Sequence, residues 1–300
     1  MTDKIKSTLK KTPVILGTAQ IINNYGVTNN YKKTVNQALD ILNMSNKLGI
    51  FTFDTSKIYL DAHKVIERFI KNKFEKFCII EKLSSNDIAI YNKENRAVHW
   101  PWLNTYKLNG GSLCLMLHNG IDYLNKDCRK NLQNCKEKGL TNLIGISVYD
   151  PEILNKCLNY GGFDLVQCPV SIADRRFCNT KLLKKINDQN IIINMRSIFL
   201  QGLLLKMPQK KISFFKEYKE IFLNYENLFP DYEKKILLAI KSVLEDIKAS
   251  IVVGVESSSQ LKTIDRMLKL KKNKYLMADI SKSRKLWGSL PRQAIDPRKW

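Results

Sequence analysis

The sequence of 300 residues lacks long hydrophobic runs and any signature of export. Its longest apolar stretches, such as Ser112–Leu117, are far shorter than the ~20 residues that a membrane-spanning helix needs. The basic N-terminal residues are not followed by the apolar segment of a secretory signal peptide. We therefore expect a cytoplasmic protein without a membrane span.

Histidines and paired cysteines are also few. The three histidines have no H-E-x-x-H-like spacing, and none of the seven cysteines forms a C-x-x-C pair. We therefore expect no metal site, and reduced cysteines that pack as small apolar side chains. Among the 13 glycines there is neither G-x-G-x-x-G nor G-x-x-x-x-G-K-[ST], so the sequence signatures of a Rossmann fold and of a P-loop are missing.

The charge is strongly positive, with 50 lysines and arginines against 28 acidic residues and a net charge of +22. Such a chain could bind nucleic acid or an anionic surface with steep salt dependence. The basic residues are scattered, however, and no element concentrates arginines and aromatic residues as nucleic-acid readers do. We therefore do not expect nucleic acid to be the main partner.

Eight short apolar runs alternate with longer amphipathic helical patterns along the chain. Eight β-α units over about 260 residues are what a closed (β/α)8 TIM barrel of the α/β class requires. An open doubly wound sheet is the competing fold, but it should carry a glycine-rich turn after the first strand. The strand candidates are Val14–Thr18, Phe51–Asp54, Phe77–Lys82, Leu113–His118, Asn142–Ser147, Leu165–Cys168, Ile191–Arg196 and Ile251–Gly254.

No linker or internal repeat divides the chain, so we predict a single domain over residues 1–300. Three segments lie outside the alternation. Residues 1–12 form a basic N-terminal arm, and residues 203–231 form an extended loop after strand seven that we expect to contain a helix. Residues 281–300 form a C-terminal tail, which either closes over the barrel mouth or packs against the barrel.

Catalytic residues of such barrels stand at the C-terminal ends of strands. Strand two is predicted to end in Asp54, with Tyr59 close behind it, strand three in Lys82 and strand four in His118. A lysine ammonium near a tyrosine stabilises the phenolate and lowers its pKa from ~10. Each residue alone could be a helix cap, a strand end or a core side chain, but together they suit protonation of a carbonyl oxygen during hydride transfer.

With these residues in place, the sequence resembles the aldo/keto reductase superfamily, in particular bacterial members associated with surface-sugar biosynthesis. Asp54, Tyr59, Lys82 and His118 match the four catalytic positions of that family. The resemblance implies that Tyr59 is the proton donor, Lys82 its partner, Asp54 the residue that orients Lys82, and His118 the residue that orients the carbonyl. The other matching motifs are Leu16–Gln20 with Tyr25, Gly26 and Asn29, then Ile144–Ser147, Val166-Gln167, Arg196–Leu204, Ile251–Val255 and Ser257–Leu261.

The resemblance also implies a nicotinamide cofactor, NADP(H) or NAD(H), held by loops and a helix N-terminus in place of a Rossmann turn. Arg196 stands where relatives often stack an aromatic ring on the nicotinamide, and it could stack likewise or form a structural ion pair. The residues implied to bind the cofactor are Gly17, Thr18, Asp54, Ser147, Gln167, Arg196, Ser197, Gly202, Gly254, Glu256, Ser257 and Gln260.

Several residues depart from the family pattern. Leu60 follows the catalytic tyrosine, and Ile22 lies in the first loop, where the family usually or often has glycine, so both are expected to add bulk near the site. Glu256 replaces a common arginine for the 2′-phosphate of NADP, and Ile264 a later asparagine. Glu256 favours NAD, whereas Lys262 and the positive field favour NADP, so the choice stays open.

We therefore predict an NAD(P)H-dependent oxidoreductase that reduces an aldehyde or ketone to an alcohol, acting as a monomer or homodimer. The substrate is expected to be carbohydrate-derived, and Arg175-Arg176 either grip a phosphorylated or nucleotide-linked sugar or form a solvated loop. The alternative is a catalytically silent dinucleotide-binding barrel that acts as a regulatory or interaction subunit, which Ile22, Leu60 and Glu256 motivate.

Overall fold

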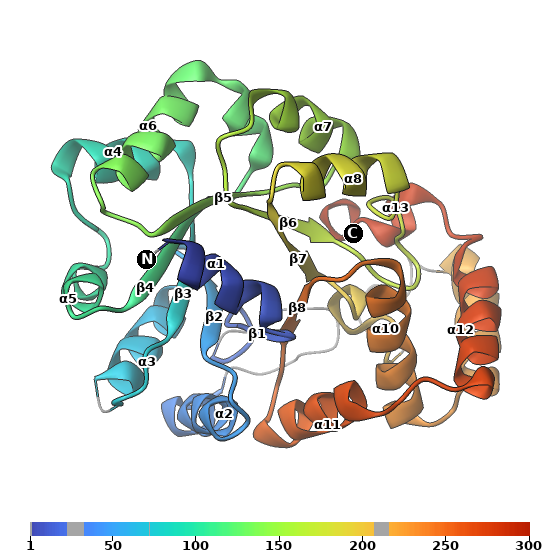
Figure 1. Cartoon of the computed structure of the whole chain (residues 1–300). Helices are drawn as coiled ribbons and strands as arrows, with labels where there is room; N and C mark the ends of the chain where they lie inside the picture. The colour runs from blue at the N-terminus through green and yellow to red at the C-terminus, as the bar shows by residue number, and fades with distance from the viewer. Residues whose placement is uncertain (1, 23–32, 72, 207–215) are drawn as a thin grey trace.

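A computed structural model describes residues 2–22, 33–71, 73–206 and 216–300 of the chain, and of Thr2 and Leu60 only the backbone. Its eight strands are all parallel and follow chain order around a closed barrel, in which the last strand pairs with the first. Helices surround the barrel (Figure 1), so the predicted (β/α)8 fold is confirmed. The strands are β1 Val14–Gly17, β2 Thr52–Ser56, β3 Cys78–Leu83, β4 Ser112–Leu117, β5 Leu143–Ser147, β6 Leu165–Pro169, β7 Ile192–Arg196 and β8 Ser250–Gly254.

Each predicted strand overlaps an observed one, and the largest difference lies at β2. This strand does not end at Asp54 as predicted but continues to Ser56, because Ser56 still pairs with Lys82 of β3. Successive side chains of a strand point to opposite faces, so Asp54 and Ser56 lie on the same face of β2. The extension of β2 to Ser56 therefore places the Ser56 hydroxyl on the same face of the strand as the Asp54 carboxylate.

The helices begin and end at local signals in the sequence. Thr34 and Gln37 form a capping box at the start of α2, and Gly49, with φ of 75°, follows its end. Asp150 caps α7 by accepting a hydrogen bond from the backbone N–H of Glu152. The helices are α1 Thr2–Lys11, α2 Val35–Lys47, α3 Leu60–Ile70, α4 Ser85–Glu94, α5 Trp102–Leu108, α6 Lys126–Glu137, α7 Pro151–Tyr160, α8 Thr180–Asp188, α9 Lys219–Leu228, α10 Tyr232–Asp246, α11 Ser258–Lys269, α12 Lys274–Trp287 and α13 Arg292–Ile295.

The predicted basic arm is folded as α1, which lies across one end of the barrel (Figure 1). Leu9 of this helix is 1% exposed and packs with barrel-interior residues such as Ile15 and Val252. Ser250 Oγ lies 3.2 Å from the carbonyl oxygen of Leu9 and 2.7 Å from that of Thr12. Because α1 fills the N-terminal end of the barrel, the C-terminal strand ends form the open face.

The segments 203–231 and 281–300 pack together in a second apolar cluster. The first contains α9, the helix expected there, and the second contains the end of α12 and all of α13. The ring of Trp287 lies 5.4 Å from that of Phe222 and 4.9 Å from that of Tyr225, centroid to centroid. The tail therefore packs against the loop after β7 and reaches the barrel mouth through Pro297. Among the described helices, none combines the length and the apolar character needed to cross a bilayer.

Candidate active site

The polar side chains of the site stand one layer above the apolar interior of the barrel. In β3, Ile80 belongs to the interior cluster, so Lys82 faces inward two residues later. In β4, Met116 is in the same cluster, and His118 follows directly after the strand. The alternation of the strands thus turns the chemical groups into one cavity at the C-terminal end of the barrel.

That cavity has a volume of about 340 Å³, within the usual size range of ligand sites. All four predicted catalytic residues line it, as do nine of the predicted cofactor residues, Asp54 being in both sets. The predicted residues in the lining are Gly17, Asp54, Tyr59, Lys82, His118, Ser147, Arg196, Ser197, Gly202, Gly254, Glu256 and Gln260.

The structure places the other three predicted cofactor residues, Thr18, Gln167 and Ser257, behind or beside this lining. Thr18 is fully buried and donates a hydrogen bond through Oγ1 to the carbonyl oxygen of Asp54, at 3.0 Å. Ser257 caps α11 by accepting a hydrogen bond from the backbone N–H of Gln260. These residues hold lining residues in place.

The carboxylate of Asp54 and the ammonium of Lys82 form a buried ion pair. Lys82 Nζ lies 2.7 Å from Asp54 Oδ2, and the two side chains are only 6% and 5% exposed. Gln167 closes a triangle, since its Nε2 donates to Asp54 Oδ1 at 2.9 Å and its Oε1 accepts from Lys82 Nζ at 3.3 Å. Burial acts to lower the pKa of Lys82, but the charges of Asp54 and then of Tyr59 outweigh it, so the pKa is raised and Lys82 stays protonated.

Tyr59 stands at the start of α3, directly beyond β2. Its backbone N–H bonds to the carbonyl oxygen of Ser56 at 2.8 Å, which sets the turn between strand and helix. Lys82 Nζ lies 5.8 Å from the centroid of the Tyr59 ring. A phenol, an ammonium and a carboxylate therefore adjoin one another at the cavity wall.

His118 is held by a residue that the sequence did not single out. The Oγ atom of Ser56 lies 3.3 Å from His118 Nδ1 and 3.0 Å from the carbonyl oxygen of Lys82. Burial is the largest cause that lowers the pKa of His118, to about 4, and the charge of Lys82 adds to it. The imidazole is therefore neutral at physiological pH, with its orientation set by Ser56.

The far end of the cavity is formed by the N-terminus of α11. Glu256 and Gln260 line it, and Gln260 Oε1 accepts a hydrogen bond from the backbone N–H of Glu256 at 2.7 Å. Ile264 contributes an apolar wall one turn further along the helix. One cavity thus extends from the buried ion pair to a helix N-terminus, which suits an elongated ligand that carries phosphates.

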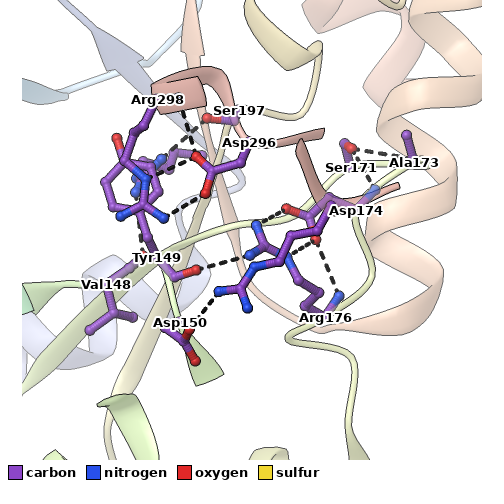
Figure 2. Close-up of polar contacts among 12 residues, drawn as sticks. Val148, Tyr149, Asp150, Ser171, Ala173, Asp174, Arg176, Ser197, Asp296 and Arg298 are labelled. Atoms are coloured by element: carbon purple, nitrogen blue, oxygen red, sulfur yellow. Dashed lines mark hydrogen bonds and ion pairs between the residues drawn. The ribbon is translucent and has the colours of Figure 1, made fainter. Parts of the chain in front are cut away.

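Arg196 ends β7 and lines the cavity. Its Cζ atom lies 3.8 Å from the ring centroid of Tyr149, and Arg298 Cζ from the tail lies 3.9 Å from the same centroid. Asp296 and Arg298 lie beside Tyr149 (Figure 2). The structural ion pair considered for Arg196 is not present among the described residues.

Arg175 and Arg176, by contrast, are both paired. Arg175 makes two hydrogen bonds to Asp246, at 3.1 and 2.9 Å. Arg176 makes two to Asp174, at 2.8 and 2.7 Å (Figure 2). Neither arginine lines the cavity. The guanidinium groups of both arginines are thus already bound to carboxylates. This pairing does not favour the prediction that they bind a phosphorylated sugar.

The residues that depart from the family pattern are only partly described. Ile22 is 5% exposed, belongs to the main core cluster and does not line the cavity, so the bulk expected from it lies in the core. The side chain of Leu60 lies outside the described part of the chain, as do Tyr25, Gly26 and Asn29. The lining also includes residues that the sequence analysis did not single out, among them Tyr149, Lys206, Tyr232 and Pro297.

Comparison with known proteins agrees with this geometry. The aldo/keto reductase family profile matches residues 13–285. A glycerol dehydrogenase from Gluconobacter oxydans is similar in structure with a TM-score of 0.69 at 15% identity, over 95% of this chain and 94% of that one. An aldo-keto reductase from Bacillus halodurans, in its holo form, gives 0.68 at 17% identity over 95% of each chain. No curated protein sequence matches significantly. With its closed barrel and a match over residues 13–285, the chain belongs to the aldo/keto reductase family.

Proposed function

We propose that the protein is an NAD(P)H-dependent oxidoreductase that reduces an aldehyde or ketone to the alcohol, or catalyses the reverse oxidation. The observation that carries this proposal is the buried Asp54–Lys82 pair, which adjoins Tyr59 and His118 in one cavity. A carboxylate and an ammonium that are 5% and 6% exposed are costly to bury, so their presence at a cavity wall supports a catalytic role.

Tyr59 acts as the proton donor to the carbonyl oxygen. The ammonium of Lys82 stabilises the phenolate that remains, and Asp54 keeps that ammonium charged and in place. His118 is neutral, and in the tautomer that carries its proton on Nε2 it can donate a hydrogen bond to the same oxygen. The single hydroxyl hydrogen of Ser56 then turns from the carbonyl oxygen of Lys82 to Nδ1 of His118. In the reverse direction the same groups remove the proton of an alcohol.

The lining fits a nicotinamide dinucleotide, which when bound would supply or accept the hydride. Ser147, Ser197 and Gly202 would hold it near Lys82 and Tyr59, with Glu256 and Gln260 at the far end. The N-terminus of α11 at the far end supports this fit, because backbone N–H groups at a helix N-terminus can bind phosphate groups. Glu256 disfavours a 2′-phosphate by charge, which makes NADH acceptable as well as NADPH.

The substrate class follows less directly from the lining. A carbohydrate-derived aldehyde or ketone suits the polar wall, and the similarity to a glycerol dehydrogenase is consistent with a polyhydroxylated alcohol as the product. We further propose that the protein works in the cytoplasm as a monomer or homodimer.

The direct test is a titration of the purified protein with NADPH and with NADH, followed by nicotinamide fluorescence. We expect micromolar or tighter binding of at least one, and turnover of short hydroxyaldehydes. Binding without turnover of any aldehyde or ketone would favour the silent barrel. No binding of either nucleotide would contradict the proposal.

A further inference from the structure

Arg196 is a cation at the catalytic end of the cavity without a carboxylate partner among the described residues. Its guanidinium donates to two neutral oxygens, Ser197 Oγ and Val148 O, each at the long distance of 3.3 Å. A guanidinium has five N–H donors, so most of this set is left for a ligand. A half-buried charge without a counter-charge is unfavourable, and a bound anion would relieve the cost.

The neighbouring arginines differ from Arg196, because the guanidinium group of each is paired with a carboxylate. Arg176 and Arg298, which both contact Tyr149, each meet a carboxylate at short distance (Figure 2), and Arg292 does so as well. The pairs are Arg176 with Asp174, Arg292 with Asp150 and Arg298 with Asp296, at N···O distances of 2.7, 2.5 and 2.5 Å.

Arg196 is also close to the reacting groups. Burial is the main cause that lowers the pKa of His118, and the positive charges of Lys82 and Arg196 act in the same direction. Lys82 is paired with the carboxylate of Asp54, whereas Arg196 has no carboxylate partner among the described residues. An anion bound by Arg196 would therefore lie near the carbonyl that His118 and Tyr59 contact.

Tyr149 fixes the plane of this guanidinium. The ring lies against Arg196 at 3.8 Å, and Arg298, which Asp296 holds through two hydrogen bonds, lies against the same ring at 3.9 Å. Stacking of a guanidinium on a ring leaves its N–H groups in the plane free to donate, and this planar fork matches the oxygens of a carboxylate or phosphate.

We propose that Arg196 binds an anionic group of the substrate, so that the preferred substrates are aldehydes or ketones that carry a carboxylate or a phosphate. This inference rests on the proposed oxidoreductase function and names its substrate class. The two kinds of anion share one chemistry, and the test below separates them.

The experiment compares kcat/KM for matched pairs of substrates with the full chain. One pair is succinic semialdehyde and butanal, for a carboxylate, and the other is glyceraldehyde 3-phosphate and glyceraldehyde, for a phosphate. We expect the wild type to prefer the charged member of at least one pair. In Arg196→Gln the ratio of kcat/KM for the charged to the neutral substrate should fall roughly 10- to 100-fold, because a hydrogen-bonded charge pair is lost. Arg196→Lys should restore part of this ratio.

Arg175→Gln is the matched control, because Arg175 is paired with Asp246 and does not line the cavity. Asp246 keeps Arg284 as a partner, so the variant should fold and keep the wild-type preference. The cofactor dissociation constant is measured for every variant by fluorescence.

Three results would overturn the inference. Equal kcat/KM for charged and neutral members, with cofactor bound and neutral aldehydes turned over, would refute it and leave the oxidoreductase function intact. An unchanged preference in Arg196→Gln, with a cofactor dissociation constant raised at least tenfold, would assign Arg196 to the cofactor phosphates. Absence of both cofactor binding and turnover would refute the proposed function itself, and this inference with it.

Discussion

The two ends of the cavity differ in how their polar groups are held. At the catalytic end, Asp54 and Lys82 stand on paired strands, and each is bonded to the other and to Gln167. At the far end, Glu256 and Gln260 lie just after β8 and in the first turn of α11, half-buried, and bond within their own segment. A barrel fixes its strand ends before any ligand arrives. Under the proposed function, the first end is therefore preorganised for chemistry, whereas the second end is suited to affinity and choice of cofactor.

The largest effect that would test this comparison is expected from Tyr59→Phe. Loss of the proton donor should lower kcat about 10²- to 10⁴-fold, while the dissociation constant for NADPH or NADH changes less than about twofold. Steady-state kinetics and fluorescence titration measure the two quantities. Tyr160→Phe on α7, at an exposed tyrosine, is the control. An equal loss of turnover and of cofactor binding would contradict the assigned role.

Asp54→Asn tests the preorganised ion pair through stability. The variant leaves a buried ammonium without its counter-charge, so the free energy of unfolding should fall by about 3 kcal/mol at pH 7. The wild-type pair raises the pKa of Lys82 from its ordinary value of 10.5, so its stabilisation is present at neutral pH and is lost as the pH rises above that value. Urea unfolding should show that the wild type and Asp54→Asn differ less in their free energy of unfolding above pH 10.5 than at pH 7.

The control for that measurement is Asp265→Asn, which removes an i, i+4 pair with Lys269 in which the lysine is 72% exposed. This variant should change the free energy of unfolding by less than about 0.5 kcal/mol. A similar decrease in the free energy of unfolding in both variants would mean that the buried pair stabilises the fold no more than a surface pair does.

The pH dependence of activity tests the state of His118. Because its pKa is lowered to about 4, chiefly by burial, the ring should stay neutral and kcat/KM should show no step from His118 near pH 6.5. The unfolded chain binds a proton near pH 6.5 and the folded protein only near pH 4, so folding stability should decline as the pH falls between these values. An inflection in kcat/KM near pH 6.5 that disappears in His118→Asn would refute this.

Ser56→Ala tests the support of His118 more finely. Loss of one hydrogen bond worth about 1 kcal/mol should lower kcat roughly fivefold, and Ser56→Thr, which keeps the hydroxyl, should restore most of it. Because the side chain is small and buried, the thermal midpoint of both variants must be measured beside kcat. A loss of kcat that the threonine does not restore would point to packing as the cause.

The smallest effect is expected at the far end, from Glu256→Gln. Removal of this partly exposed charge should lower the ratio of the NADPH to the NADH dissociation constant about fivefold, in line with other partly solvated charge contacts. Glu137→Gln, at an exposed site on α6, is the control. An unchanged ratio would show that the carboxylate does not face the 2′ position of the ribose.

The barrel and the convergence of Asp54, Tyr59, Lys82 and His118 on one cavity were predictable, because the sequence contains both the alternating apolar runs and the polar residues at their ends. Orientation within a strand was harder to foresee. Glu81 adjoins Lys82 in sequence, yet it faces outward, where its carboxylate lies 2.9 Å from His63 Nε2, and burial raises its pKa. The lining by Tyr149 and Pro297 depends on how loops and tail fold back over the barrel, and no local pattern encodes that.

The closure of the barrel between β1 and β8 has a consequence for the way the protein folds. Pairing of Val14–Gly17 with Ile251–Gly254, and the contact of Ser250 with Leu9, join residues about 240 positions apart in the chain. Contacts of such long sequence separation carry a high loop-closure cost and slow the folding rate. During synthesis the first strand must wait for the last, so the cavity wall shared by Gly17 and Gly254 forms only after nearly the whole chain has been made.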